Sequence, residues 1–426
     1  MRVLLSTWGS RGDVEPLAGL AVGLRELGAE VRVCAPPDEE FVALLARVGV
    51  PLVPLGPSVR SVVTGERPPS AANAFRLAPE LVAARYETLT AAAEGCDALL
   101  ATGLMPAGAR SVAEKLGIRY VFACFHPFGL PSRHFPPQSR PGRPSPREET
   151  DLKVLWEHDA QRVNELYGEA ENSHRAVLGL PPVDNVRDYA VTDRPWLAAD
   201  PTLGPWKDLT DLDLVQTGAW ILPDERPLPE GLEAFLDAGA PPVYVGFGSM
   251  AAHAPKDIAR VAVEASRAQG RRVLLARGWA GLAPIDDVDD CFVVGEVNQQ
   301  ALFGRVAAVV HHGGAGTTTT AARAGAPQVV VPQIVDQPYW AARVAELGIG
   351  AAHDGPTPTF ESLSAALSTA LAPETRARAR AVAPTIRTDG ATVAAKLLLD
   401  MTGTTGTTGT TGTTGTTGTT GTTGRE

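Results

Sequence analysis

Short runs of β-branched and apolar residues alternate along the chain with Ala-, Leu- and Arg-rich stretches of helical length. This alternation is typical of βαβ units, in which helices join parallel strands and cover the sheet that they form. The continuous apolar run Val3-Leu4-Leu5 fits a strand that is covered on both faces. The pattern therefore predicts an α/β fold built on parallel sheets.

The alternation occurs twice. The expected strands are residues 2–6, 30–35, 51–55, 98–102 and 119–125 in the first half, and 242–247, 272–276, 291–294, 307–311 and 328–332 in the second half. Between the first two strands, residues 17–27 have apolar side chains at helical spacing, and Gly28 stands where a glycine ends a helix. Each set is about 170–200 residues long, the size of one domain. We therefore predict two Rossmann-like doubly wound domains rather than one barrel, which needs eight evenly spaced units.

Proline-rich segments interrupt the alternation in the middle of the chain. Residues 128–146 are rich in Pro, Ser, Arg and His and predict an exposed loop, and residues 151–174 have a helical pattern. The Thr-Gly-Thr repeat at residues 402–424 has no large apolar side chain to bury, so we predict a flexible tail. The expected parts are an N-terminal domain (1–205), a linker (206–222), a C-terminal domain (223–385), a helix packing back on the first domain (386–401) and the tail (402–426).

Composition excludes several classes of protein. The net charge is −10, with 38 Lys and Arg against 48 Asp and Glu, whereas a nucleic-acid-binding protein needs a basic face. No run approaches the roughly 18 apolar residues that span a bilayer, and the N-terminus lacks the apolar region of a signal peptide. The four cysteines are scattered, which argues against a disulfide framework and a zinc site. We expect a cytoplasmic monomer that contacts neither nucleic acid nor membrane.

Two glycine turns follow expected strands of the second half. The first contains His312, Gly313, Gly314, Gly316 and Thr317, and its threonine begins a helix. Glycines let a ligand approach the backbone, and a helix N-terminus offers free N–H groups to an anion. This turn predicts a diphosphate site, with a helix cap beside a buried histidine as the alternative.

The second glycine turn, Phe247-Gly248-Ser249, also follows a strand. Ligands of open α/β sheets bind at the carboxyl ends of the strands, so we expect both turns to face one crevice. A tight turn between a strand and a helix explains this motif equally well.

Two further polar sets follow strands. Asp336 and Gln337 form an acid–amide pair that is able to hold the vicinal hydroxyls of a sugar, although such pairs also occur in ordinary turns. Ser10, Arg11 and Asp13 follow the first strand and supply a base and a cation, although Gly-Asp is also a common turn.

No metal site is expected. The Asp-x-Asp pairs at residues 211–213 and 287–289 lie in linker-like or acidic loop sequence, and the histidines form no closely spaced ligand set. His126 and His134 lie in or beside the Pro-rich loop, where they are candidates to line a cleft for an acceptor.

Together these motifs resemble those of glycosyltransferase family 1, whose members have the GT-B fold, two Rossmann-like domains facing across a cleft. Further segments are similar to the glycosyltransferases of vancomycin- and teicoplanin-group glycopeptide antibiotics. These segments are residues 112–118, 172–175, 180–183 and 215–228. The resemblance extends over essentially residues 1–400, and the Thr/Gly tail has no counterpart in it.

The resemblance implies a role for each motif. Asp13 is expected to be the general base that deprotonates the acceptor hydroxyl. Trp279 and Val297 are expected at the nucleobase, and Asp336 and Gln337 at the donor sugar. Thr320 departs from the broader family, because plant relatives have a ribose-binding Glu there. The expected diphosphate ligands are Ser10, Arg11, Ser249, His312, Gly313, Gly314, Gly316 and Thr317.

The implied activity is the transfer of a sugar from a UDP- or TDP-sugar to a hydroxyl of a glycopeptide aglycone or pseudoaglycone, with inversion and without metal or another cofactor. One alternative is a nucleotide-sugar epimerase of the same fold, which needs no acceptor cleft, whereas residues 128–146 favour an acceptor. The other is a non-catalytic nucleotide-sugar-binding helper, which loss of Asp13 or of the His312 turn would favour, yet both are present. A dehydrogenase is disfavoured because no GxGxxG motif follows a strand.

Overall fold

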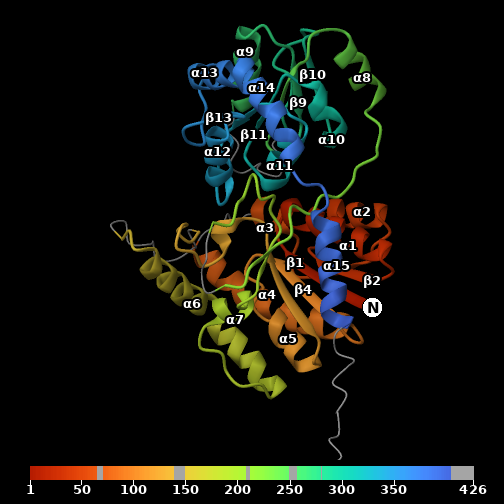
Figure 1. The fold of residues 1–426 in the computed structure, drawn as a ribbon, viewed down its shortest axis with the longest axis vertical. Coiled ribbons are helices and arrows are strands. Elements are labelled where there is room, and N and C mark those ends of the chain that lie inside the picture. Colours follow the sequence, from red (N-terminus) through yellow and green to blue (C-terminus); the bar gives the residue numbers. More distant parts are fainter. Residues whose placement is uncertain (65–70, 139–148, 208–211, 249–256, 280, 404–426) are drawn as a thin grey trace, which may run out of the picture.

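Two parallel sheets, one above the other in Figure 1, organise the chain. The computed structural model describes residues 1–64, 71–138, 149–207, 212–248, 257–279 and 281–403. Both sheets have the strand order of doubly wound Rossmann-like folds, with the first strand of each domain in the middle. The predicted pair of Rossmann-like domains is confirmed.

The first sheet has the order β3-β2-β1-β4-β5-β6-β7, and its neighbouring strands are parallel. Its strands are β1 (Arg2–Trp8), β2 (Glu30–Ala35), β3 (Leu52–Pro54), β4 (Ala98–Gly103), β5 (Arg119–Cys124), β6 (Trp196–Leu197) and β7 (Val215–Gln216). Its helices are α1 (Arg11–Glu26), α2 (Glu39–Arg47), α3 (Val59–Thr64), α4 (Ala71–Ala92), α5 (Ala109–Leu116), α6 (Leu152–Leu178) and α7 (Val186–Val191), with a 3₁₀ turn at Pro127–Gly129.

The second sheet has the order β10-β9-β8-β11-β12-β13 and is also parallel. Its strands are β8 (Val243–Gly246), β9 (Val273–Ala276), β10 (Cys291–Val294), β11 (Ala308–His311), β12 (Gln328–Val330) and β13 (Gly350–Ala352). The helices are α8 (Glu230–Asp237), α9 (Ile258–Ala268), α10 (Gln299–Leu302), α11 (Ala315–Arg323), α12 (Gln337–Glu346), α13 (Phe360–Leu371), α14 (Pro373–Val382) and α15 (Gly390–Gly403), with 3₁₀ turns at Phe303–Arg305 and Ala383–Thr385.

Buried side chains of β1 pack in two separate hydrophobic cores, one on each face of the sheet. Val3 and Leu5 pack with apolar residues of α1, α2 and α15, whereas Leu4 packs with those of α4, α5, α6 and α7. Successive side chains of a strand point to opposite faces, which explains why this strand reads as a continuous apolar run.

Helix α1 begins at Arg11, earlier than its apolar spacing indicates. Ser10 is the N-cap: its Oγ accepts a hydrogen bond from the Gly12 N–H, and its own backbone N–H donates to Asp13 Oδ2. This capping box fixes the start of the helix at polar residues that contribute nothing to the hydrophobic pattern.

The expected linker, residues 206–222, contains β7, which pairs with β6 in the first sheet. Trp220 and Leu222 belong to the core of the first domain as well. The domain boundaries themselves stay predictions.

Three strands were not expected from the sequence. The strands β6 and β7 are only two residues long, too short to produce a periodic signal, and β13 consists of Gly-Ala-Ala, which has no β-branched side chain.

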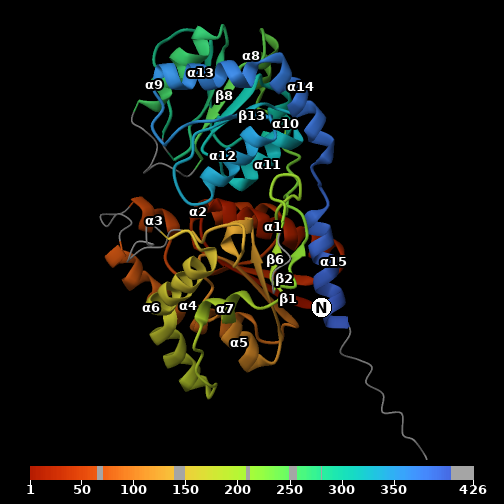
Figure 2. The same cartoon turned by 60° about the vertical axis from the view of Figure 1, so that its left-hand side comes forward.

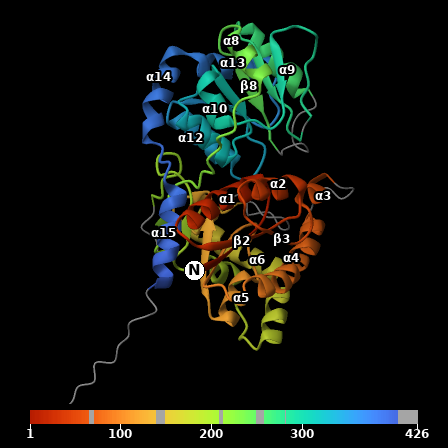
Figure 3. The ribbon, with the colours of Figure 1, turned by 90° about the vertical axis from the view of Figure 1, so that its right-hand side faces the viewer.

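Helix α15 lies beside the first domain, although it follows the second domain in the sequence (Figure 3). Ala391, Ala394 and Leu398 are part of the core beneath α1, and an added Cβ at Gly23 would lie 3.5 Å from the Ala391 carbonyl oxygen. A further apolar cluster joins the two domains: Leu197 and Leu203 precede the expected linker, and Trp340 comes from the second domain. Among the described helices, none has the length and apolar character that crossing a membrane requires.

Candidate active site

The carboxyl ends of the strands in the two sheets face each other, with α1 and α2 opposite α11 and α12 (Figure 2). Contacts between residues that follow these strands support this placement. Arg11 of α1 pairs with Glu296 of the second domain, and Trp279 of the second domain donates to Glu40 of α2. The motifs that follow strands are therefore gathered between the domains.

Asp13 occupies the first turn of α1. Its Oδ2 accepts the Ser10 N–H at 2.8 Å, and a Cβ added at Gly9 would lie 2.1 Å from the same oxygen, so only glycine fits there. Burial, and to a smaller extent the charge of Asp336, raise the pKa of Asp13 to about 7, against the lowering by the Ser10 hydrogen bond and by His126. A carboxylate with this pKa is suited to accept a proton near neutral pH.

The two histidines at the end of β11 have different environments. His311 is fully buried, its Nε2 lies 2.9 Å from Gln328 Oε1, and its Nδ1 accepts the Gly313 N–H. His312 Nδ1 is buried without a partner in the described part of the chain. Burial lowers the pKa of His312 to about 4, although Asp336 opposes this, so its imidazole is neutral at pH 7.

The start of α11 completes the turn. Gly314 is its N-cap and provides no side-chain hydrogen bond, and a Cβ added there would lie 2.7 Å from His312 Nε2. Gly313 has φ +94°, in the left-handed region that favours glycine. The open helix N-terminus, Gly316 and Thr317 included, therefore adjoins the imidazole ring of His312, an arrangement that suits an anion site.

Asp336 and Gln337 mark the start of α12. Asp336 Oδ2 accepts the indole N–H of Trp340 at 2.8 Å. The Oε1 atom of buried Gln337 accepts the N–H groups of Gln333 and Ile334 and so shapes the turn. The charge of Asp336 acts on Asp13 and His126 of the first domain and on His312 of the second, which places its carboxylate between the domains.

His126 belongs to the same group of charges, whereas His134 lies farther along its loop. The His126 ring stacks on Phe128 with centroids 4.3 Å apart, and its Nε2 lies 2.9 Å from Gln138 Nε2. Burial lowers the pKa of His126, but Cys124, Asp336 and Asp13 raise it by more, and the pKa stands above its usual value. The backbone N–H of His134 donates to Ser132 Oγ at 3.0 Å.

Arg11 reaches the second domain. Its Nε lies 2.7 Å from Glu15 Oε2, while Nη1 and Nη2 each lie 3.1 Å from an oxygen of Glu296. Arg226 and Arg47 contact the same Glu296 carboxylate at 2.9 and 3.4 Å. Sequence reasoning missed Glu296, because a single Glu in a loop gives no signal that three arginines from distant segments converge on it.

The residues expected at the nucleobase lie beside these contacts between the domains. Trp279 Nε1 donates to Glu40 Oε2 at 3.2 Å, and the Arg60 guanidinium lies 5.3 Å from the centre of the Trp279 ring. Val297 directly follows Glu296 and packs on the core of its own domain. Ser249, the remaining expected phosphate ligand, lies outside the described residues.

Replacing Glu296 with Gln is expected to lower the free energy of unfolding by about 1 kcal/mol, because its ion pairs are half-exposed and each contributes little. The Arg11 contact, and after it Arg226, lowers the pKa of Glu296 to about 2, so this stabilisation is present above the ordinary Glu pKa and lost as the pH falls toward 2. Thermal unfolding at low and high salt measures it. Glu264→Gln, which breaks a pair within α9, is the control; an equal, salt-independent loss in both variants would contradict the expectation.

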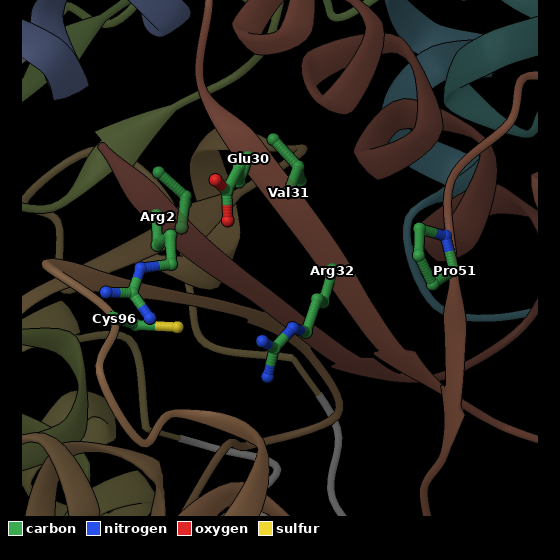
Figure 4. Close-up of a pocket in the computed structure, with 7 residues that line it drawn as sticks. Arg2, Glu30, Val31, Arg32, Pro51 and Cys96 are labelled. Carbon is green, nitrogen blue, oxygen red and sulfur yellow. The ribbon is translucent and has the colours of Figure 1, made fainter.

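No group of three or more His, Cys, Asp or Glu side chains in the described ranges has the arrangement of a metal site. A cavity of about 270 Å³ lies at the amino ends of β1 and β2, where Arg2, Glu30, Arg32 and Cys96 line it (Figure 4). These residues are at the opposite edge of the sheet from Asp13, so this cavity is separate from the candidate active site.

Known proteins resemble the chain over nearly its whole length. It is 61% identical to "Glycosyltransferase GtfE" of Amycolatopsis orientalis, and this match covers 95% of this chain and 98% of that protein. It is 60% identical to "Vancomycin aglycone glucosyltransferase" of the same organism, over 94% of this chain and 97% of that protein. It is 56% identical to "dTDP-epi-vancosaminyltransferase" of the same organism, over 94% of this chain and 97% of that protein.

Two further comparisons agree with this result. The family model "Erythromycin biosynthesis protein CIII-like, C-terminal domain" matches residues 284–399. The solved structure of the glycosyltransferase VinC in complex with dTDP superposes with a TM-score of 0.68 at 19% identity, over 95% of this chain and all of that one.

The two facing Rossmann-like domains and these matches define the class, a glycosyltransferase of the GT-B fold. Within that class, the chain belongs to the family of the vancomycin-group glycopeptide antibiotic glycosyltransferases.

Proposed function

We propose that the protein transfers a sugar from a TDP- or UDP-sugar to a hydroxyl of a glycopeptide aglycone or pseudoaglycone, with inversion and without a metal ion. The observation that carries the proposal is the pairing of a base with an anion site between the two domains. Asp13, with a pKa near 7, stands on one side, and the uncapped N-terminus of α11 with the unpartnered Nδ1 of His312 stands on the other.

The names of the relatives support the substrate classes. One relative is named for the vancomycin aglycone and another for a dTDP-linked vancosamine sugar, and VinC was solved with dTDP. All four cysteines of this chain are free, which fits a reducing compartment. We propose that the protein acts as a monomer in the cytoplasm.

The first chemical role is that of Asp13. A phenol has a pKa of about 10 and is a poor nucleophile at neutral pH, and a positioned base contributes about 10²–10⁴-fold to the rate. Asp13 accepts the proton of the acceptor hydroxyl as its oxygen attacks the anomeric carbon. The diphosphate leaves from the opposite face of the sugar, so one displacement inverts the configuration.

The second role belongs to the turn between β11 and α11. Negative charge grows on the departing diphosphate, and the N–H groups at the start of α11 point toward the position of that charge. A neutral His312 stabilises the charge by donating a hydrogen bond from Nδ1. Asp336 is placed to bind hydroxyls of the sugar, while Gln337 holds the turn that carries Asp336.

The direct test is incubation of the protein with a vancomycin-type aglycone and a panel of TDP- and UDP-sugars, followed by mass spectrometry of the acceptor. NMR of the product and of the remaining donor then gives the sugar configuration, because anomers and epimers have equal mass. The expected result is an acceptor heavier by one sugar, with the opposite anomeric configuration to the donor. An altered sugar nucleotide without a glycosylated acceptor would instead identify an epimerase, and binding without any turnover would identify a helper protein.

Turnover is expected to persist in excess EDTA, because the N-terminus of α11 and His312 provide the groups that stabilise the leaving charge. The measurement is the transfer rate before and after chelation, with the chelated enzyme passed through a desalting column. Loss of activity that Mg²⁺ or Mn²⁺ restores would contradict the metal-independent part of the proposal.

A further inference from the structure

The loop that follows β4 holds an exposed leucine beside the loop of the proposed base. The Leu104 N–H donates to the Trp8 carbonyl oxygen at 3.1 Å, and Trp8 is the last residue of β1, directly before the segment that leads to Asp13. The side chain of Leu104 is 43% exposed, whereas the next residue, Met105, is buried. Leu104 is therefore an apolar side chain at the sheet edge where Asp13 lies.

The close approach of the two loops is built into the backbone. Gly103 has φ +82°, and an added Cβ would lie 2.4 Å from Thr7 Oγ1 and 2.9 Å from the Trp8 carbonyl oxygen. A side chain at position 103 would push the loops apart. The glycine thus lets the chain that leads to Leu104 lie directly on the end of β1.

A buried arginine fixes the loop from beneath. Arg85 of α4 is 1% exposed, and its Nη2 donates to the Leu104 carbonyl oxygen at 2.8 Å. Its Nη1 donates to the carbonyl oxygens of Met105 and Ala107 at 2.9 and 3.2 Å. Burying a guanidinium costs free energy unless its donors find partners, and here three carbonyls of one short loop each accept a hydrogen bond from it. The loop is thereby held in one conformation with Leu104 on its outer side.

We propose that Leu104 packs against an apolar ring face of the acceptor and determines acceptor affinity and orientation toward Asp13, and that Arg85 is the residue that positions it. The inference rests on the proposed function, and it names a contact within the acceptor site. A phenolic acceptor has a polar hydroxyl, which must reach Asp13, and apolar ring faces, which need a fixed apolar partner to orient that hydroxyl.

The test compares Leu104→Ala with Leu27→Ala. Leu27 is the C-cap of α1, at the opposite end of that helix from Asp13, and its side chain is 41% exposed. We expect Leu104→Ala to weaken aglycone binding and to raise the acceptor KM about tenfold, the order of effect of removing a few carbons from an apolar contact. Donor KM and the slow hydrolysis of donor without acceptor should stay unchanged, and Leu27→Ala should match the wild type in all four measurements.

The outcomes separate this inference from the proposed function. Aglycone binding is measured by calorimetry in the presence of nucleoside diphosphate, which requires no turnover. If the wild type binds aglycone but transfers no sugar, the proposed function fails, and the effect of Leu104→Ala on affinity still decides the inference. Equal aglycone affinity of wild type and Leu104→Ala, or no aglycone binding by either, overturns it.

Arg85→Lys tests the positioning role. A lysine ammonium keeps the charge but lacks the planar fork that reaches three carbonyls. We expect acceptor KM to rise while donor KM stays constant, and the double variant with Leu104→Ala should show no further rise. A lower melting temperature with an unchanged acceptor KM would show that Arg85 supports the fold alone.

Discussion

Asp13→Asn is expected to lower kcat at pH 7 by about 10²–10⁴-fold, because an amide cannot take the proton of the acceptor hydroxyl. The Asn Oδ1 atom is still able to accept the Ser10 N–H, so the start of α1 should be retained. The measurement is steady-state transfer with saturating donor. Glu26→Gln, at the exposed other end of the same helix, is the control and should have normal kcat.

The pH dependence gives this prediction a second readout. Below about pH 7 Asp13 is protonated, so the wild-type rate should rise with pH through that value. Asp13→Asn should lack this rise near pH 7. Its rate should increase between about pH 8 and 10, where a phenol begins to ionise by itself. A variant with wild-type turnover at pH 7 would rule out Asp13 as the base, and His126 and His134 would be tested next.

Asp13→Asn should not lower the stability of the fold at neutral pH, although it lowers kcat. The pKa of Asp13 in the folded protein lies above its ordinary value of 3.8, so the folded state binds the proton more tightly than the unfolded state. The wild-type carboxylate therefore destabilises the fold as the pH rises from about 4 through about 7. Asp13→Asn should be at least as stable as the wild type at neutral pH, which thermal unfolding measures.

His312→Ala is expected to lower kcat/KM for the donor by about 10²–10³-fold, the cost of removing one donor that stabilises a growing negative charge. The buried Nδ1 has no partner in the described residues, so the substitution should remove a ligand contact rather than a contact of the fold. Calorimetry with nucleoside diphosphate and donor kinetics measure the effect. Aglycone affinity is the internal control, because the residues proposed to contact the acceptor, Leu104 among them, belong to the first domain.

The protonation state of His312 adds a further check. With its pKa near 4, the imidazole stays neutral between about pH 5 and 8, so diphosphate affinity should not follow a histidine titration in that range. His312→Asn, which keeps a neutral hydrogen-bonding group, should retain more donor affinity than His312→Ala. Unchanged donor kinetics in both variants would show that the turn binds the donor without this side chain.

The sequence predicts the class of fold because its signals are repetitive and local. Continuous apolar strands and glycines at strand ends recur in both halves, and both sheets are parallel, as the sequence predicts. The elements that sequence reasoning missed have no such signal. The strands β6 and β7 have two residues each; β6 pairs with β5, which is distant in the sequence, and β7 pairs with β6.

The candidate site divides in the same way. Asp13, His312 and Asp336 follow strands, which the sequence shows; the rule that ligands bind at carboxyl strand ends predicts one crevice for the glycine turns, and the resemblance implies the roles of Asp13 and Asp336. The partners of Arg11 and Trp279 were not predictable, because Glu296 and Glu40 lie in the other domain and their contacts depend on how the two domains pack. The sequence also does not show that Gln337 shapes its own turn, because an amide that follows an acid is equally suited to bind a sugar.

The position of α15 limits where a hybrid between this protein and a relative can be joined without mixing the two parents within one core. A Cβ added at Gly390 would lie 2.4 Å from the Ala219 carbonyl oxygen, so the returning chain crosses the outgoing chain at close range before α15 joins the core beneath α1. The last helix of the described residues thus packs on the domain that contains the first residue. A hybrid joined once between the domains pairs one parent's α1 with the other parent's α15. Recombination that preserves both cores needs a second junction before residue 390, so that α15 comes from the same parent as α1.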